Sequence, residues 1–351
     1  MILGLYMTRV YAVRFFGALA GFAALVQLLD LFDVAGEILE RGEGVLGLLR
    51  YTALRMPVIL VDVAPFAALI GALFTFMALA GKSEVIAMRA LGLAPRKIVM
   101  LLAPIVLLLG GLHLIANDRV APPAEAALRD WMLRTADEQP PAEDAESWLR
   151  SGPILIGFGG AAPDGARLER VWIYERSATD NLQRRITAAR AIYEGRLWRL
   201  EDAAVDQDLA ERRAESAMTI DLRLTPADVL ELSQPLEHLS LAQLHQGATG
   251  GPTGARSEAF FRTRLMMVWS FMAVPAIMLV IAAPVAFASI RRRGAVGLQA
   301  ALGLGWGLGF ILLAGILRTL GESGVLPALV AVWTAPLLFA LMAAARLSDT
   351  K

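Results

Sequence analysis

Residues 265–290, LMMVWSFMAVPAIMLVIAAPVAFASI, form a run of 26 residues without a charged side chain. A bilayer core about 30 Å thick is crossed by roughly 20 apolar residues in a helix that rises about 1.5 Å per residue. This run is therefore long enough to span a membrane. The composition agrees, because 56% of the 351 residues are hydrophobic and only 19% are charged. These values exclude a simple soluble enzyme and a disordered protein.

The same criterion, applied outward from this run, predicts five more spans. Four of them are uncharged and cover residues 63–81, 98–116, 294–317 and 323–345. The first span, at about 10–31, contains Arg14, whose long side chain can reach the near interface. No small-x-small cleavage site follows it, so we expect a retained helix rather than a signal peptide. The prediction is six spans in two groups of three.

Residues 117–256, between the two groups, are polar. They hold 16 Arg, no Lys and 23 Asp or Glu, a net charge of −7, and are long enough for one soluble domain. Segments rich in β-branched and aromatic residues, with a hairpin turn at Glu194-Gly195, suggest a sandwich or jelly roll. Helix starts follow at Thr225-Pro226 and Ser240, and residues 246–254 read as a flexible linker. The predicted strands are 153–158, 168–174, 185–193, 196–200 and 218–224.

Cations in the short loops predict the orientation. Eleven Lys or Arg lie at the two chain ends and in the loops after spans 2 and 4, whereas the loop after span 1 carries three. Loops rich in Lys and Arg stay in the cytoplasm. We therefore expect both termini to be cytoplasmic and residues 117–256 to lie outside the cytoplasm.

Motifs of known enzymatic sites are absent from the sequence. There is no cysteine, and neither His-Glu-x-x-His nor Gly-x-Ser-x-Gly occurs. Gly81-Lys82-Ser83 resembles the end of a phosphate-binding loop, but the first glycine of that loop is replaced by Phe76. The glycines at 303, 305, 307 and 309 lie inside an uncharged span and favour close helix contact or a groove. We predict no catalytic residue, no metal site and no cofactor in this chain. The balance of 33 cations and 33 anions gives no reason to expect nucleic acid.

The loop between spans 2 and 3 is the most informative short segment. Ser83 can cap a helix whose first turn contains Glu84, where the helix dipole favours an anion, and Gly92 ends it. Such a helix could lie on the inner leaflet, or it could be a coupling helix that docks in a groove of a cytoplasmic motor. Its predicted apolar stripe consists of Val85, Met88 and Leu91.

Charged residues near the span ends leave two interpretations open. Arg55 and Asp62, near the outer start of span 2, are costly if they face lipid and less so at the interface. Arg262 and Arg264 lie at the outer end of span 4, and Arg318 lies at that of span 5. These arginines could meet the phosphates of an anionic lipid or could anchor the helix ends.

The ten residues Ser83-Glu84-Val85-Ile86-Ala87-Met88-Arg89-Ala90-Leu91-Gly92, together with the layout, resemble the LptF/LptG permeases of lipopolysaccharide export. Residues 65–73, PFAALIGAL, are similar to that family too, as is Leu224-Thr225-Pro226. The resemblance covers essentially the whole chain. Within the family the chain looks most like LptG, on the basis of Trp198-Arg199-Leu200 and of Gly324-Val325-Leu326-Pro327, and an LptF-like paralogue is the alternative.

The resemblance implies a multi-pass protein of the bacterial inner membrane with a membrane α-helical fold. Six transmembrane helices, arranged 3+3, would carry an inserted periplasmic β-jellyroll-like domain. Residues 1–116 would form helices 1–3 with a coupling helix at about 82–92. Residues 117–256 would form the periplasmic domain with its C-terminal helical segment and linker, and residues 257–351 would form helices 4–6.

The resemblance also implies partners. An LptF-like permease would complete a heterodimer, and an LptB-like ATPase dimer, which holds ATP and Mg²⁺, would bind the coupling helices. An LptC-like single-span protein and an LptA-like periplasmic bridge would complete the route. Lipopolysaccharide would enter a cavity between the two helix bundles from the outer leaflet of the inner membrane and pass to the bridge. This chain would be a transport subunit and not an enzyme.

Three sets of candidate site residues follow from the resemblance. Glu84 would pair with a cation of the ATPase, and lateral gates would involve spans 1 and 5. Some LptG proteins carry Lys after span 1 where lipid phosphates bind, whereas this chain has Asp30, Asp33, Glu37 and Glu40 there. The coupling set is Ser83, Glu84, Val85, Met88, Arg89 and Leu91. The headgroup set is Arg41, Arg50, Arg55, Arg262, Arg264 and Arg318. The cavity or gate set is Phe22, Leu25, Phe66, Leu69, Phe310 and Leu313.

Two other functions fit the same layout. Another ABC-type permease, for example one that moves lipoproteins, would share the spans and the extracytoplasmic domain. A non-transporting scaffold for envelope assembly would depend on no ATPase. Identification of the bound lipid and of the partners would separate these functions.

Overall fold

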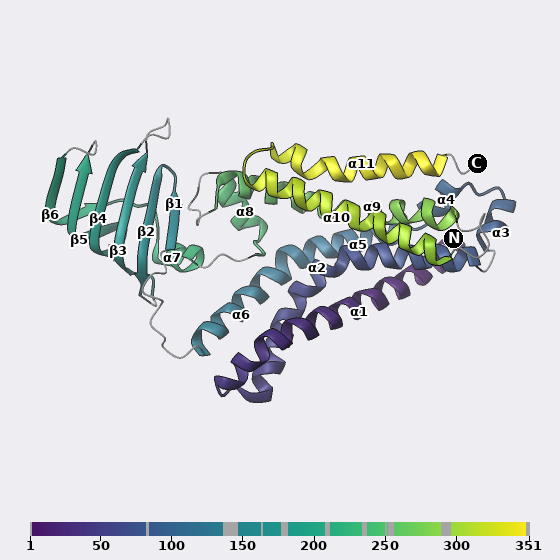
Figure 1. Cartoon of the computed structure of the whole chain (residues 1–351), viewed down its shortest axis with the longest axis horizontal. Coiled ribbons are helices and arrows are strands. Elements are labelled where there is room, and N and C mark those ends of the chain that lie inside the picture. The colour runs from purple at the N-terminus through teal and green to yellow at the C-terminus, as the bar shows by residue number, and fades with distance from the viewer. Residues whose placement is uncertain are drawn as a thin grey trace. The chain divides into compact units, whose positions relative to one another are not determined.

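The computed structural model describes residues 2–81, 84–135, 147–162, 164–176, 182–207, 211–233, 237–249, 251, 256–288 and 296–348. Its chain divides into two compact units. The first consists of Met1–Thr135, His238–Leu241 and Thr263–Lys351 and contains the membrane helices (Figure 1). The second consists of Ala136–Glu237 and Ala242–Arg262 and contains a β-sheet. We describe each unit by itself.

Six helical segments of the described chain are long and apolar enough to cross a membrane, as predicted. They are α1 (Ile2–Glu40), α2 (Gly44–Gly81), α5 (Ala103–Ile115) with its continuation, α9 (Glu258–Ala288), α10 (Val296–Glu322) and α11 (Ala328–Ser348). The start of α1 and the end of α11 lie at the same end of this unit as the short helix α3 (Glu84–Ala90) (Figure 1). The membrane helical fold with an inserted β domain is therefore confirmed.

The third span is segmented, unlike the continuous helix predicted for residues 98–116. Pro95 begins α4 (Pro95–Met100), and the helix breaks before α5, which carries Pro104 in its first turn. Proline fits the first turn of a helix because its missing N–H would have no partner there. The π-helix η1 (Ala116–Val120) then continues into α6 (Ala121–Thr135), well past the predicted end.

Helices α1 and α2 also run beyond their predicted spans. They have 39 and 38 residues, so each is about 57 Å long, nearly twice the roughly 30 Å of a bilayer core. The predicted loop after span 1 is mostly helical and turns at Gly42, where φ is +78°. We call residues 32–61 the helical extension. Ile38 and Tyr51 of this extension pack with Leu128 and Trp131 of α6.

The bundle core depends on close helix approaches at glycine. A Cβ atom added to Gly307 of α10 would lie 2.0 Å from Cδ2 of Leu69 on α2, and one added to Gly303 would lie 2.5 Å from Cδ2 of Leu73. Each leucine thus occupies the space of a missing side chain. A Cβ atom on Gly305 would meet nothing within 4 Å. A Cβ atom on Gly309 would meet only Cζ of Phe339, at 3.8 Å, so the predicted close contact is confirmed for Gly303 and Gly307 and not for Gly305 and Gly309.

The second unit contains one six-stranded antiparallel sheet in the order β1-β2-β3-β4-β5-β6. Such sequential hairpins make a meander, and the crossing connection of a jelly roll does not occur among the described strands. Strand β1 was not predicted, since its five residues SWLRS give too short a pattern. The strands are β1 (Ser147–Ser151), β2 (Ile154–Ala161), β3 (Arg167–Arg176), β4 (Leu182–Glu194), β5 (Leu197–Gln207) and β6 (Glu211–Ile220).

One face of the sheet forms the core of this unit. Trp198 is fully buried there, and its Nε1–H donates to the Leu224 carbonyl over 2.9 Å. Helix α7 (Pro226–Ser233) begins as predicted, because the Asp228 carboxylate accepts from the Thr225 N–H at 2.8 Å and the Asp228 N–H donates to the Thr225 hydroxyl. Helix α8 (Leu241–Ala248) follows Ser240, also as predicted.

Candidate functional site

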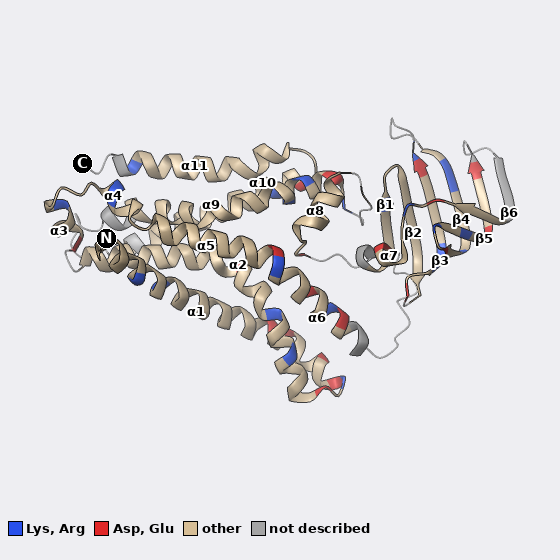
Figure 2. Ribbon diagram, turned by 180° about the vertical axis from the view of Figure 1, so that it is seen from behind, with Lys and Arg blue, Asp and Glu red and all other residues tan. Residues whose placement is uncertain are grey.

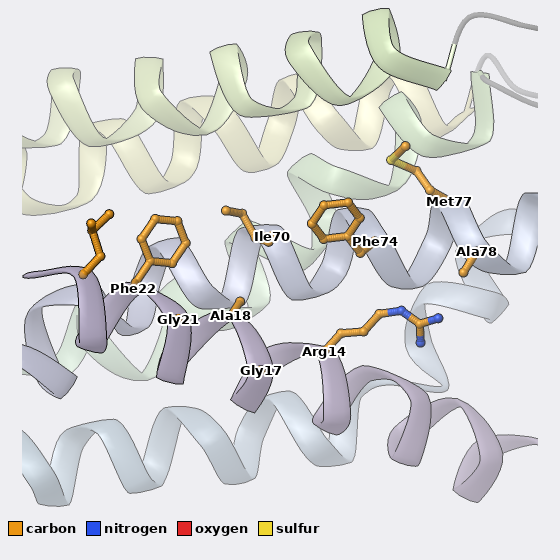
Figure 3. Close-up of a pocket in the computed structure, with 10 residues that line it drawn as sticks. Arg14, Gly17, Ala18, Gly21, Phe22, Ile70, Phe74, Met77 and Ala78 are labelled. Carbon is orange, nitrogen blue, oxygen red and sulfur yellow. The ribbon is translucent and has the colours of Figure 1, made fainter.

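An open apolar groove of about 720 Å³ lies between α1 and α2 (Figure 3). Gly17, Ala18 and Gly21 make room for it on α1, because their side chains are absent or small. Phe22, Ile70 and Phe74 follow one another along it in the close-up. The remaining lining residues are Arg14, Leu25, Met77 and Ala78. A concave apolar surface with few polar groups is typical of a site for an apolar ligand.

Arg14 is the one charged residue that lines this groove (Figure 3). Its Nη1 donates to the Val10 carbonyl over 3.0 Å, which fixes the side chain beside α1. In the sequence, Arg14 is recognisable as the single cation within the first predicted span, at about 10–31. Because the rest of the lining is apolar, an anionic group of a bound lipid would meet its countercharge here.

The six candidate cavity or gate residues lie in different places. Phe22 and Leu25 line the groove, and the Phe66 ring centre is 6.3 Å from that of Phe22. Leu69 and Phe310 are buried in the bundle core, and Leu313 packs against that core. The structure thus brings the two α1 residues and Phe66 together and places the other three within or against the packed bundle.

Helix α3 is held to the bundle by its buried face. Val85 and Met88 belong to the bundle core, as the predicted stripe requires. Leu91 differs from that prediction: it is 82% exposed, because α3 ends at Ala90 and Gly92 turns the chain with a φ of +82°. Ile86 and Arg89 are also exposed. Ser83 lies outside the described residues.

Glu84, at the start of α3, is joined to α1. The Tyr6 hydroxyl lies 3.1 Å from both carboxylate oxygens of Glu84. A charged acceptor makes such hydrogen bonds stronger than neutral ones. No sequence pattern predicts this contact, because 78 residues separate Tyr6 from Glu84.

The three candidate headgroup arginines of the first group lie on the helical extension and contact residues of α1 and α6. Arg41 donates to the Met132 carbonyl over 2.8 Å and pairs with Glu37. Arg50 lies over the Trp131 ring, 5.3 Å from its centre. Arg55 Nε is 3.2 Å from Asp30 Oδ2. Asp30, one of the acidic residues where some LptG proteins carry Lys, is therefore paired with an arginine.

The other three headgroup candidates are also ion-paired. Arg264 Nε and Arg318 Nε lie 2.6 Å and 2.8 Å from the same Glu322 oxygen, so two cations share one carboxylate. Arg262 pairs with Glu258. Figure 2 shows charged residues near the ends of the membrane helices and on the helical extension, with long uncharged stretches between them. The Arg264–Glu322–Arg318 group keeps one net positive charge.

The described residues contain no group of three or more His, Cys, Asp or Glu that could hold a metal ion. Six spans, an apolar groove open along two helices and a short exposed helix at one bundle end define a multi-pass membrane protein built to handle an apolar ligand.

The family model for the lipopolysaccharide export system permease LptF/LptG matches residues 5–349, and the chain therefore belongs to this family. It is a lipopolysaccharide export permease with six membrane-spanning helices and an inserted β domain. A comparison with individual curated proteins finds no match.

Proposed function

We propose that this chain is the LptG-like half of an exporter that a separate ATPase dimer drives. The observation that carries the proposal is the way in which helix α3 is packed against the bundle while some of its apolar side chains stay exposed. The helix follows α2 along the chain and is fixed to the core by Val85 and Met88. Ile86 on the helix and Leu91 directly after it are exposed. A firmly held helix with exposed apolar residues is suited to transmit force from a docked partner. Glu84 would pair with a cation of that partner.

The orientation proposed from the loop cations agrees with this role. The start of α1, the end of α11 and α3 share one end of the first unit (Figure 1). Arg89 of α3 and Arg96 and Lys97 of α4 belong to this end, which we assign to the cytoplasm on the positive-inside rule. Residues 117–256 are then periplasmic, and the ATPase, with its ATP and Mg²⁺, meets the end of the bundle that carries α3.

The groove between α1 and α2 is the proposed surface for acyl chains of lipopolysaccharide. Burial of acyl chains contributes about 0.8 kcal/mol per CH₂, so extraction of a lipid with several chains requires an external energy source. Closure of the ATPase would push α3 and, through the shared core, α2. The groove would narrow, and the acyl chains would leave toward the periplasmic domain.

The remaining partners complete this route. An LptF-like permease would close the cavity from the other side, and an LptC-like single-span protein and an LptA-like bridge would receive the lipid. The LptG-like assignment is supported by Trp198-Arg199-Leu200 at the start of β5 and by residues 324–327 before α11. Anionic headgroup phosphates would meet the group formed by Arg264, Arg318 and Glu322.

Purification in mild detergent, with partners and bound lipid identified by mass, tests the proposal. We expect an ATPase, a second and different permease of this family, and lipopolysaccharide. A bound lipoprotein would indicate another ABC-type permease, and the absence of any ATPase would indicate a scaffold. A co-purified LptG would show that this chain is the LptF-like half.

The variant Glu84→Arg tests the coupling assignment. We expect it to abolish lipid-dependent ATPase activity while the membrane subunits remain folded and paired. Glu169→Arg, which makes the same change of charge on an exposed site of β3, is the matched control. Normal export by the Glu84→Arg complex would show that the coupling assignment is wrong.

A further inference from the structure

A short segment that follows α7 and includes the first residue of α8 belongs to the membrane unit, although the residues on either side of it belong to the β-sheet unit. His238–Leu241 follow α7 and lead into α8, yet they group with the membrane helices. The chain therefore returns to the membrane unit for this short segment before it continues to α9. Such a segment needs specific contacts, because four residues provide little apolar area.

The contacts of this segment are made by carboxylates from three elements, α2, η1 and α6. The His238 N–H donates to Glu125 Oε2 of α6 over 2.9 Å, and His238 Nδ1 lies 3.0 Å from the same oxygen. His238 Nε2 lies 3.3 Å from Asp62 Oδ1 of α2. The Leu241 N–H donates to Asp118 Oδ1 of η1 over 2.6 Å. Both ring nitrogens of His238 thus face an acidic oxygen, as in an imidazolium that donates twice.

The charges around His238 favour its protonated form. Burial disfavours the imidazolium, but the hydrogen bonds and negative charges of Asp62 and Glu125 outweigh it and raise the pKa of His238 to about 9. The third carboxylate, Asp118, is also paired with Arg119, 3.0 Å from Oδ2. Asp62 acts electrostatically on His113 of α5 as well. The His238 and Glu125 side chains are only 10% and 14% exposed, so solvent weakens their contact little, whereas Asp62 is 57% exposed and its contact is more strongly screened.

We propose that residues 238–241 form a charged clasp that fastens the chain between α7 and α8 to α2 and α6. Helix α2 holds the clasp through Asp62 and leads into α3 at its other end. Under the proposed function, a movement of α2 that begins at α3 would be passed to the polypeptide on both sides of the clasp; the clasp itself does not rest on that function. The clasp is a positioning device, and it does not depend on which lipid the protein carries.

Hydrogen–deuterium exchange on the full chain in detergent micelles tests the clasp without any transport assay. Wild type is compared with His238→Gln, His238→Lys and His245→Gln, the last being an exposed histidine of α8 and the matched control. At pH 7.5 we expect exchange of a peptide covering residues 237–249 to rise at least about tenfold in His238→Gln, the factor that one pKa unit represents. His245→Gln should exchange at the wild-type rate.

The pH dependence of the same exchange gives a second readout that a purely structural role would not move. The pKa of His238 is raised by the clasp, so the stabilisation is complete below about 6.5 and is lost as the pH rises through about 9. The protection of wild-type amides from exchange, corrected for the pH dependence of intrinsic amide exchange, should therefore be constant at low pH and fall as the pH rises through about 9. In His238→Lys, whose amine has an ordinary pKa of about 10.4, protection should persist to higher pH.

Three outcomes would overturn the clasp. They are equal exchange in wild type and His238→Gln, a change of the same size in His245→Gln, and a wild-type profile without a step near pH 9. None of these readouts involves lipopolysaccharide or the ATPase. Failure of the clasp would therefore leave the proposed function untouched, and the reverse also holds.

Discussion

The Tyr6 hydroxyl bridges both carboxylate oxygens of Glu84, at 3.1 Å each, and so ties the start of α1 to the start of α3. One hydroxyl proton serves two acceptors, so the bond is shared between them. The carboxylate is held in one orientation relative to the bundle. Under the proposed function, Tyr6 presents Glu84 to the cation of the ATPase.

The first prediction concerns this contact. Tyr6→Phe removes the hydroxyl and keeps the ring, so the membrane subunits should stay folded while lipid-dependent ATPase activity falls about threefold to tenfold. That range corresponds to the roughly 0.5–1.5 kcal/mol of a typical net hydrogen bond. Activity of the reconstituted complex is the measurement, with Tyr193→Phe, whose hydroxyl donates to Gly195 in the β-sheet unit, as the control.

A double-mutant cycle distinguishes positioning from general damage. If Tyr6 acts through Glu84, Tyr6→Phe should cost little once Glu84→Gln is already present, because the two effects are not additive. Additive losses would mean that Tyr6 contributes by another route.

The sequence predicted the elements whose signal is local. An uncharged run of 26 residues can hardly be anything but a span, and the Thr225–Asp228 cap is a pattern of neighbours along the chain. The helical extension was missed because charges such as Glu37 and Arg50 end an apolar run without ending a helix. A hydropathy criterion locates the edge of the bilayer, and the helix continues past it.

The candidate site was predictable only where its residues share one helix, because contacts between distant segments leave no pattern along the chain. Val85 and Met88 face the core because their spacing fits one face of a helix. Leu91 continues that spacing in the sequence, but the helix ends at Ala90, one residue before it. Contacts such as His238 with Glu125, 113 residues apart, depend on how distant segments meet, and no spacing along the chain encodes them.

The second prediction tests the contact of α10 with α2. In Gly307→Ala the new methyl group would overlap Leu69, so we expect a loss of stability of about 1–3 kcal/mol, typical of overpacking. Gly305→Ala, on the same helix but with open space, should change stability by less than about 0.5 kcal/mol. Thermal unfolding in detergent is the measurement. Leu69→Ala should cost less stability in the Gly307→Ala background than in wild type, and additive losses would contradict the proposed overlap.

The third prediction tests the groove. Gly21→Leu places a side chain in the groove, where a Cβ atom meets nothing within 4 Å, so the protein should fold normally. Lipid bound per purified complex should fall at least about threefold, because the volume open to acyl chains shrinks. Gly36→Leu adds the same side chain at an open site of α1 away from the groove and should leave the bound lipid unchanged. Equal lipid in both variants would exclude the groove as the acyl surface.

The last prediction concerns Glu322, whose carboxylate separates Arg264 from Arg318. In Glu322→Gln the two guanidinium groups lose their shared anion and repel each other at short range, and the removal of one member of a partly buried pair is costly. The Glu322 side chain is 19% exposed, whereas that of Glu258, which pairs with Arg262, is 51% exposed. We therefore expect Glu322→Gln to lower the free energy of unfolding by about 1–3 kcal/mol and Glu258→Gln by less than about 1 kcal/mol.

Salt separates repulsion from lost packing in this comparison. High ionic strength screens like charges, so added salt should narrow the difference between Glu322→Gln and wild type, as measured by thermal unfolding at low and high sodium chloride. Inorganic phosphate should stabilise Glu322→Gln more than wild type, because two arginines without their carboxylate attract an anion. If salt and phosphate act equally on both proteins, Glu322 holds α9 and α10 together by packing, and the shared charge is not the cause.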